Sequence, residues 1–412
     1  MFEEYTIKDV MDEIIDYRGK TPKKLGGDWS ESKTKYMALS AKNIKKGRIV
    51  HRETIRYVDE DMYKKWMKQE VNKGTILITS EAPFGELLYW DLDDKIVLSQ
   101  RLFGLKIKKE YNPKYIYYYM YTSSFQSELS GRATGSTVTG LRQPELLKCH
   151  LKVPSRKIQD KIADILTCID KKIELNDMIN NNLFELLKQE FREKFYNKEE
   201  KNSYLIDYIS ETIGGDWGRE SPEGNNNTKV YCVRGTDIPS MEYGNKGNAP
   251  IRYILEKNYK NKKLDPNNII IEISGGSPTQ STGRTAYITK SILDMYNSPL
   301  LCTNFCRAIE AKSDILAPFV YMNLKLMYED DIFFNWENGT TGIKNLALND
   351  MLSNVEVVIP DEDAMKEYYL LFNNVMNKIS GNSNENIKLE QLKDTLLPKL
   401  MNGEIDLDKI DI

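Results

Sequence analysis

Residues 35–44 read KYMALSAKNI, and residues 229–238 repeat the pattern as KVYCVRGTDI. The repeat extends outward from these segments: Ile55-Arg56-Tyr57 returns as Ile251-Arg252-Tyr253. Further on, Leu146-Leu147 leading to Val153-Pro154 returns as Leu352-Ser353 leading to Ile359-Pro360. The spacing stays near half of the 412-residue length. The sequence therefore predicts a duplicated unit, with two similar surfaces that engage two similar targets.

The composition is that of a folded protein, with 40% hydrophobic and 10% aromatic residues. The apolar runs are shorter than the roughly 18 residues that a membrane-spanning helix needs. The acidic start, Met1-Phe2-Glu3-Glu4, is unlike a signal peptide. The five cysteines are scattered, which favours a reducing compartment over a disulfide framework. We therefore expect a cytoplasmic protein without a membrane span.

The pattern divides the chain into four segments, at residues 1–155, 156–199, 200–360 and 361–412. The first and third segments mix short strands with short helices. The clearest elements are strands at Ile76–Thr79, Leu102–Ile107 and Ile269–Ile271, and a tyrosine-rich helix at Pro113–Phe125 that begins with proline. We expect two similar domains of mixed α/β structure.

The second and fourth segments show helical periodicity. No glycine or proline occurs between Arg156 and Tyr196, and apolar residues recur there mostly every three or four positions, which predicts one long amphipathic helix. The fourth segment repeats this pattern, but Gly381-Asn382-Ser383-Asn384 is expected to interrupt its helix and Pro398 to kink the last turns. Such long helices need a partner to cover their apolar faces.

The two long helices are predicted to pack on each other. The residues expected in their shared seam are apolar and recur at corresponding positions: Ile162, Ile165, Ile169, Ile173 and Leu183 on the first helix, and Leu371, Val375, Ile379, Leu389 and Leu392 on the second. The predicted fold class is α+β. Two similar mixed α/β domains are separated by two long helices that form an antiparallel coiled coil with pseudo-two-fold symmetry.

A strong local charge favours nucleic acid as the target. The formal net charge is −3, yet the segment from Arg18 to Arg52 holds eleven Lys or Arg against only Asp28 and Glu31. A phosphate backbone responds to the local field rather than to the average over the chain. The alternative is a solvated basic loop with no ligand.

Polar and basic residues at matching places in the two halves are the candidate DNA-binding residues. In the first half they are Arg18, Lys20, Lys42, Lys45, Lys46, Ser80, Arg101, Arg132, Thr134, Ser136 and Thr137. In the second half they are Arg219, Arg234, Thr236, Ser274, Ser277, Arg284, Arg307, Thr340, Thr341 and Lys344. Such side chains position a protein on phosphates and read base edges.

The sequence holds no convincing catalytic motif. Asn112-Pro113-Lys114-Tyr115 lacks the second proline of the amino-methyltransferase loop, and Asn112 has an ordinary role as a helix cap. The loop from Gly276 to Thr285 differs from a P-loop in spacing and has arginine in place of lysine. The two histidines and five cysteines are too sparse for a zinc site. We expect a protein that is not an enzyme and needs neither cofactor nor metal.

Taken together, the half-chain repeat and the two long helices resemble the specificity subunit of type I restriction-modification enzymes over essentially the full length. Two shorter motifs carry the resemblance further: Gly135-Ser136-Thr137 running to Val153-Pro154, and its echo from Gly342 to Ile359-Pro360. The leucine-rich ending, Leu396-Leu397-Pro398-Lys399-Leu400 followed by Gly403-Glu404-Ile405, is typical of the family.

The resemblance implies two target-recognition domains that each read one half of a split double-stranded DNA sequence. It also implies that the helix pair sets the spacing and docks two methyltransferase subunits, and that restriction-translocase subunits join for cleavage. The alternative is a free-standing bipartite DNA-binding regulator without a methyltransferase partner. A third possibility is an enzyme in its own right, which the missing catalytic motifs disfavour.

Overall fold

The computed structural model describes residues 2–134, 139–277, 280–339 and 343–407. The chain forms two compact units: unit 1 comprises Met1–Lys171 and Leu389–Ile412, and unit 2 comprises Lys172–Lys388. The boundary between the units therefore falls within each of the two long helices. No helix of the described residues is both long and apolar enough to cross a membrane.

Unit 1 is built on a four-stranded antiparallel sheet. Its strand order is β2 (Met11–Asp16), β10 (Leu102–Ile107), β7 (Ile76–Thr79) and β8 (Leu87–Tyr89). A three-stranded sheet has the order β6 (Arg56–Val58), β3 (Tyr36–Leu39) and β9 (Ile96–Leu98), and β3 and β9 run parallel. Two strand pairs complete the unit, β1 (Glu3–Thr6) with β11 (His150–Val153) and β4 (Ile44–Lys45) with β5 (Arg48–Ile49). Its shorter helices are α1 (Ile7–Val10), α2 (Glu60–Trp66), α3 (Pro113–Tyr119), α4 (Ser123–Gly131) and α5 (Gln143–Leu146).

Unit 2 repeats these sheets in the same order. The four-stranded sheet is β13 (Ile209–Gly214), β20 (Cys306–Ala311), β16 (Ile269–Glu272) and β18 (Thr285–Tyr287). The three-stranded sheet is β15 (Ile251–Leu255), β14 (Asn226–Val233) and β19 (Leu300–Cys302), again with one parallel pair. The remaining strands are β12 (Ser203–Tyr204) with β23 (Glu356–Val357), and β17 (Ser274–Gly275), β22 (Lys344–Leu346) and β21 (Glu337–Asn338). Its shorter helices are α7 (Ile238–Glu242), α8 (Glu256–Lys262), α9 (Lys290–Asp294), α10 (Ala317–Glu329) and α11 (Leu348–Asn354).

Strand pairing defines which residues of the two units are equivalent. Met37 lies opposite Tyr57 and Tyr231 lies opposite Ile251, so the repeat between Lys35–Ile44 and Lys229–Ile238 holds in three dimensions. The same pairing makes Tyr57 equivalent to Ile251. The predicted match of Ile55–Tyr57 with Ile251–Tyr253 is therefore wrong by two residues. A three-residue likeness in an edge strand does not fix register, because only hydrogen bonding to the neighbouring strand does.

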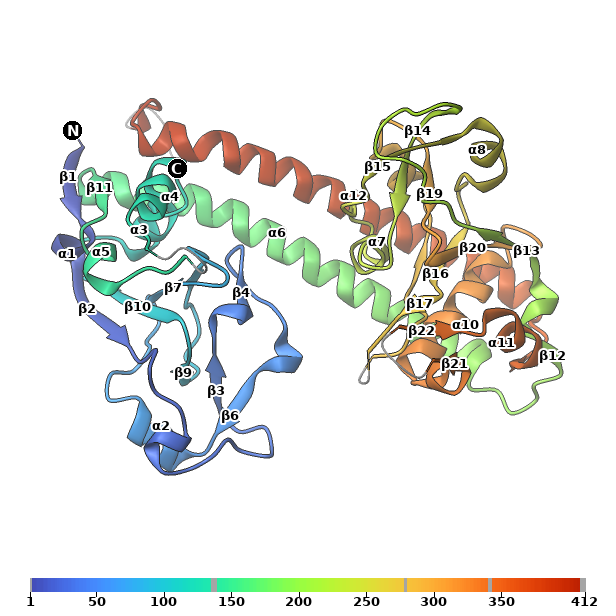
Figure 1. Cartoon of the computed structure of the whole chain (residues 1–412), viewed down its shortest axis with the longest axis horizontal. Coiled ribbons are helices and arrows are strands. Elements are labelled where there is room, and N and C mark those ends of the chain that lie inside the picture. The colour runs from blue at the N-terminus through green and yellow to red at the C-terminus, as the bar shows by residue number, and fades with distance from the viewer. Residues whose placement is uncertain (1, 135–138, 278–279, 340–342, 408–412) are drawn as a thin grey trace. The chain divides into compact units, whose positions relative to one another are not determined.

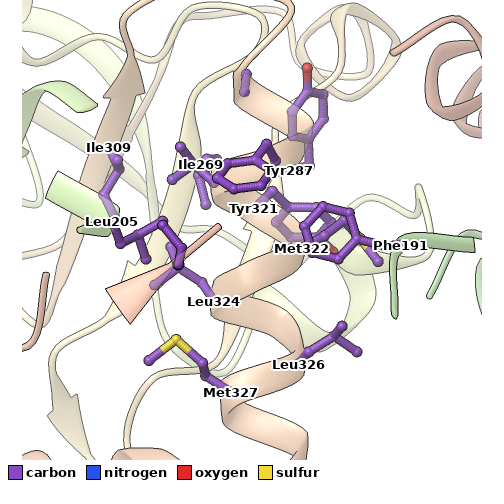
Figure 2. Packing of buried hydrophobic residues seen from close by; sticks show 14 of the residues in the cluster. Phe191, Leu205, Ile269, Tyr287, Ile309, Tyr321, Met322, Leu324, Leu326 and Met327 are labelled. Atoms are coloured by element: carbon purple, nitrogen blue, oxygen red, sulfur yellow. The ribbon is translucent and has the colours of Figure 1, made fainter. Parts of the chain in front are cut away.

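The core of unit 2 lies between α10 and the four-stranded sheet. Tyr321 of α10 packs 5.6 Å from Tyr287 of β18 between ring centroids, and Ile269 of β16 belongs to the same buried cluster. Figure 2 shows this packing, with Phe191 reaching the cluster from the end of a long helix. The long helices are thus part of the core of the unit rather than appendages to it.

The first long helix, α6, spans Arg156–Phe191 and continues as a π-helical turn to Tyr196 (Figure 1). The second, α12, spans Glu362–Met401 without a break and contains Pro398. The predicted long helix after Arg156 is confirmed, but the predicted interruption at Gly381–Asn384 is wrong. The polar residues in that stretch have hydrogen-bond partners on other elements: Asn382 donates to the Asn180 side chain at 2.8 Å, and Ser383 donates to the Tyr243 carbonyl at 2.9 Å.

The two long helices pair antiparallel within each unit. In unit 1, the Lys393 ammonium lies 2.6 Å from the Asp170 carboxylate, and Lys161 donates to the Leu407 carbonyl. In unit 2, the Asn176 side chain donates to Asn386 at 2.9 Å. The partner number falls as the α6 number rises, as an antiparallel pair requires.

The residues predicted for the helix seam differ in burial. Ile162, Ile169, Ile173, Val375 and Ile379 are buried, whereas Ile165, Leu183, Leu371 and Leu389 are half-buried. Leu392 is 46% exposed and stands outside the buried face, so its assignment to the seam is wrong. The nearest buried positions of α12, Asn386 and Leu397, are six and five residues away and therefore face another side of the helix.

The strands predicted at Ile76–Thr79, Leu102–Ile107 and Ile269–Ile271 are confirmed.

The tyrosine-rich segment forms two helices instead of the single one expected for Pro113–Phe125. Helix α3 ends at Tyr119, and Thr122 caps the start of α4 by accepting from the Phe125 amide at 3.3 Å. This side-chain cap begins a new helix and so separates α4 from α3.

Candidate nucleic-acid interface

Three of the predicted DNA-binding residues of unit 1 come together where β7 ends and β10 begins. The Ser80 amide donates to the Arg101 carbonyl at 2.8 Å, and the Ser80 carbonyl accepts from the Leu141 amide at 2.9 Å. Arg18 donates to the Leu141 carbonyl at 3.0 Å. We call this end of the sheet, with Arg18, Ser80, Glu81, Arg101 and Leu141, the unit 1 rim.

Arg18 is held rigidly at the unit 1 rim. Its guanidinium donates to both oxygens of Asp16, at 2.8 and 2.9 Å, and lies 3.8 Å from the centroid of the Phe103 ring. A guanidinium that is both hydrogen-bonded and stacked presents its remaining donors in a fixed direction.

Arg101 is the most accessible charged residue of the unit 1 rim among those described here. Its side chain is 46% exposed and its Nε lies 3.0 Å from a Glu81 oxygen. Its backbone is left-handed with φ +67°, and Ala82 nearby has φ +42°. Non-glycine residues in this region cost about 1–3 kcal/mol each and tend to gather at functional sites. The left-handed backbone of Arg101 and Ala82 is therefore consistent with a functional role for this end of the sheet.

The predicted lysines of unit 1 fall into two groups. Lys42, Lys45 and Lys46 are exposed, and the Lys46 amide donates to a Glu86 carboxylate oxygen at 2.7 Å. Lys20 instead donates to the Trp66 carbonyl at 3.0 Å and lies 4.2 Å from the Tyr17 ring centroid. Burial lowers the pKa of Lys20, and its contact with DNA stays a prediction.

The predicted DNA-binding residues between Arg132 and Thr137 begin with an arginine whose charge is balanced by two carboxylates. Arg132 donates twice to one oxygen of Glu128 and lies 3.6 Å from Glu145. Thr134 pairs with Gly140 through two backbone hydrogen bonds, which closes the loop next to the unit 1 rim. Ser136 and Thr137 lie outside the described residues.

Unit 2 has an equivalent rim where β16 ends and β20 begins. The Phe305 carbonyl accepts from the Ile273 amide at 2.8 Å and from the Ser274 amide at 3.2 Å, and the Leu346 amide donates to the Ile273 carbonyl at 2.9 Å. The first and third of these bonds match the bond from Ser80 to Arg101 and the bond from Leu141 to Ser80 in unit 1. We call Ile273, Ser274, Phe305 and Leu346 the unit 2 rim. Ser274 also donates through its hydroxyl to the Asn345 side chain.

Several predicted cations of unit 2 are occupied by carboxylates of the same unit. Arg284 donates at 2.8 and 2.6 Å to Glu272, which is 4% exposed. Arg234 is paired with Asp237 at 3.0 Å, and Lys344 with Glu337 at 2.7 Å. These pairs hold loops in place, because a buried carboxylate requires a partner.

The other predicted residues of unit 2 are more open or lie outside the described structure. The side chain of Arg219 is 62% exposed and lies 3.5 Å from Glu223, and Thr236 is exposed. Ser277 forms a backbone bridge with Gln280, and Arg307 is half-buried. Thr340 and Thr341 fall outside the described residues. Contacts of any of these side chains with DNA stay predictions.

The pairing of strands changes one assumed equivalence and adds residues. Phe103 pairs with Asp16, and Arg307 pairs with Gly214 at the equivalent position, so Arg101 corresponds to Phe305 and not to Arg307. Sequence reasoning missed Phe305 because an apolar residue beside a buried strand is read as core. The available signal was its place in a tight turn between two strands.

The described residues contain no group of three or more His, Cys, Asp or Glu side chains placed to hold a metal ion. All five cysteines are free, and Cys168 is exposed whereas the other four are buried. Burial raises the pKa of the Cys302 thiol to about 12, which makes it unreactive at neutral pH.

Comparison with known proteins places these features in a family. Residues 1–185 match the family described as the type I restriction modification DNA specificity domain. The MjaIX type I restriction enzyme specificity subunit of Methanocaldococcus jannaschii is 24% identical over 86% of this chain and 83% of its own length. The HindI specificity subunit of Haemophilus influenzae is 21% identical over 82% and 88%. The chain is thus similar to type I specificity subunits over most of its length.

The likeness of this chain to specificity subunits extends to the fold. The crystal structure of the S subunit of a type I restriction-modification system from M. genitalium matches it with a TM-score of 0.53 at 16% identity. The match covers 97% of this chain and 96% of the other. The fold with two mixed α/β units and two long helices is thus shared by a known specificity subunit.

Proposed function

We propose that this chain is the DNA-specificity subunit of a type I restriction-modification complex and that it reads a double-stranded target in two separate parts. The observation that carries the proposal is the duplicated rim: the same two backbone contacts recur in unit 1 and unit 2 on sheets of the same strand order. A protein that presents one surface twice is suited to a target with two parts.

We assign the target-recognition domains to residues 1–155 and 200–360, and the spacer to residues 156–199 and 361–412. The exposed lysines Lys42, Lys45 and Lys46 would contact phosphates, which fixes position on the duplex without reading sequence. The rims would then face base edges. The spacer helices would set the number of base pairs between the two parts of the target.

The partners are two methyltransferase subunits, joined by restriction-translocase subunits for cleavage. A patch on α6 supports this part of the proposal: Leu175 and Met178 are each 54% exposed, Leu186 is 44% exposed and Ile179 is 42% exposed. An apolar stripe left open on a long helix favours a protein partner. The subunit itself is non-catalytic, and we place it in the cytoplasm with the DNA and its partners.

A free-standing DNA-binding regulator is the alternative function. It would have no use for the open apolar face around Leu175 and Met178, because exposing such a face without a partner promotes aggregation. The observation therefore favours a subunit of a complex over a regulator that acts alone.

Mapping methylated adenines across a genome, with and without this chain, tests the proposal. With the chain and its methyltransferase present, we expect methylation at one split sequence and co-purification of the two proteins. Methylation that is unchanged when the chain is deleted would contradict the proposal. A chain that binds a split site tightly but captures no methyltransferase would support the regulator instead.

A further inference from the structure

A two-residue turn occupies the same place in both rims. Gln100-Arg101 joins β9 to β10, and Asn304-Phe305 joins β19 to β20. The residue before each turn is fixed by the parallel strand beside it: the Ser99 amide donates to the Leu39 carbonyl at 2.8 Å, and the Thr303 amide donates to the Val233 carbonyl at 2.9 Å. The two turns are therefore equivalent in backbone position.

All four turn residues are exposed, although the strands on either side are buried. Phe305 is 56% exposed, the largest exposed fraction among the described phenylalanine, tyrosine and tryptophan side chains. A single exposed aromatic ring is common on protein surfaces and means little by itself. The position of Phe305 is informative because the equivalent residue of unit 1 is Arg101, which forms an ion pair with Glu81.

The chemistry of the unit 1 turn matches a G·C base pair. Arg101 lies 3.0 Å from Glu81, and the side chains are 46% and 32% exposed. In the major groove, an arginine can donate to guanine O6 and N7, and a glutamate can accept from cytosine N4. An ion pair that is already formed and open to solvent presents both functions side by side.

The chemistry of the unit 2 turn matches an A·T base pair. Asn304 can exchange two hydrogen bonds with adenine, and an aromatic ring such as Phe305 can contact the thymine methyl group. The residue equivalent to Glu81 is Ser274, whose hydroxyl donates to Asn345. The carboxylate and the guanidinium of unit 1 are thus both replaced by uncharged groups at this position.

We propose that this turn is a duplicated base-reading element, in which Arg101 with Glu81 selects a G·C pair in one half-site and Asn304 with Phe305 selects an A·T pair in the other. This inference rests on the proposed function. The rims hold the turn by backbone hydrogen bonds, so the side chains can differ between units without changing the fold.

The test uses the full chain in complex with its methyltransferase and selects bound sequences from a DNA library randomised over both half-sites. The variants are Arg101→Lys, which keeps the charge and loses the bidentate fork, and Asn304→Ala and Phe305→Ala. Lys45→Ala serves as the matched control, because loss of a phosphate contact weakens binding to all sequences alike.

We expect Arg101→Lys to lower the preference for one G·C pair about tenfold or more, and Phe305→Ala or Asn304→Ala to do the same for one A·T pair in the other half-site. Each variant should leave the second half-site unchanged, which verifies that the complex is folded. Base preferences equal to those of the unaltered chain, or lost in both half-sites together, would overturn the inference. An unaltered complex that selects no split sequence would overturn the proposed function itself.

Discussion

Lys325 shows how a single residue connects α10 of unit 2 to the long helix α6. Its ammonium pairs with Glu242 and lies 3.3 Å from Glu329, which also accepts from Lys188 of α6 at 2.9 Å. The side chains of Lys325 and Glu242 are each only 10% exposed. Burial raises the pKa of Glu242, and the charge of Lys325 opposes this effect.

Replacing Lys325 with methionine leaves the Glu242 carboxylate buried without its cation. We expect the free energy of unfolding to fall by about 3–5 kcal/mol at neutral pH. The loss should shrink as the pH falls, because a buried carboxyl with a raised pKa takes up a proton more readily when folded than when unfolded. Urea denaturation at two pH values measures both effects.

The matched control for this change is Lys366→Met on α12, where Lys366 pairs with Glu362 on the surface. Exposed pairs of this kind contribute little, so urea denaturation should be unaltered. Equal losses in the two variants, or a loss for Lys325→Met that grows at lower pH, would show that burial of the cluster is not what matters.

Individual site residues were only partly predictable from the sequence. Arg101 was recognisable as a candidate because it is a cation beside the predicted strand Leu102–Ile107, and Arg18 because it lies in the basic segment from Arg18 to Arg52. The carboxylates that occupy Arg284 and Lys344 could not be foreseen, because Glu272 and Glu337 meet them through strand pairing and loop closure. Phe305 was not recognisable as a site residue because an apolar side chain next to a strand is usually part of the core.

At the scale of elements, a layer of polar side chains between α6 and α12 in unit 2 explains why α12 was expected to be interrupted. Asn180, Asn382 and Ser383 are all buried, and they hydrogen-bond across the seam. In the sequence, Gly381-Asn382-Ser383-Asn384 has the composition of a turn. Buried polar groups that find partners on a facing helix are a device for fixing register, and only the partner reveals it.

The polar layer predicts a non-additive pair of mutations. Asn180→Leu or Asn382→Leu alone should lower the free energy of unfolding by about 1–3 kcal/mol, because each leaves the side-chain amide of the other asparagine buried without its partner. Changing both Asn180 and Asn382 to leucine should be close to neutral. Urea denaturation of the two single variants and the double variant completes the cycle.

A double variant that loses the sum of the two single losses would mean that Asn180 and Asn382 act independently. Thr395→Ala on the exposed side of α12 is the control, because its hydroxyl donates only within its own helix, to the Gln391 carbonyl. That change should leave the transition unmoved.

At the scale of the whole molecule, the duplication was the most predictable feature. The sheet orders β2-β10-β7-β8 and β13-β20-β16-β18 match, as the half-chain repeat implied. Unit 1 contains both the N-terminal and the C-terminal segment, and a Cβ added at Gly403 would lie 2.7 Å from the Phe2 ring. Recognition chemistry was less predictable, because the rims share backbone contacts but not side chains.

The open face of α6 predicts how the complex assembles. Met178→Asp should weaken binding of the methyltransferase subunit roughly a hundredfold, because a carboxylate would be buried without a partner in the interface. Co-purification and titration with the methyltransferase measure the loss. Leu92→Asp, at a 47% exposed position in a loop of unit 1, is the control and should bind normally. Normal binding by Met178→Asp would move the docking site elsewhere.

We propose that the two long helices form a spacer between two DNA-recognition domains and set the number of base pairs between the half-sites. Inserting four residues between Asp177 and Met178, together with four between Ser383 and Asn384, lengthens both helices. The contact of Asn176 with Asn386 and that of Asn180 with Asn382 remain on their own sides of the insertions. A four-residue insertion between Asp93 and Asp94, in an exposed loop, is the control.

The decisive measurement is the sequence that the complex methylates after the paired insertion. Four helical residues add about 6 Å, so the gap between the half-sites should grow by roughly one to two base pairs while both half-sites stay the same. The loop insertion should leave the gap unchanged. An unchanged gap after the paired insertion, with methylation intact, would contradict the claim that the helices set the spacing.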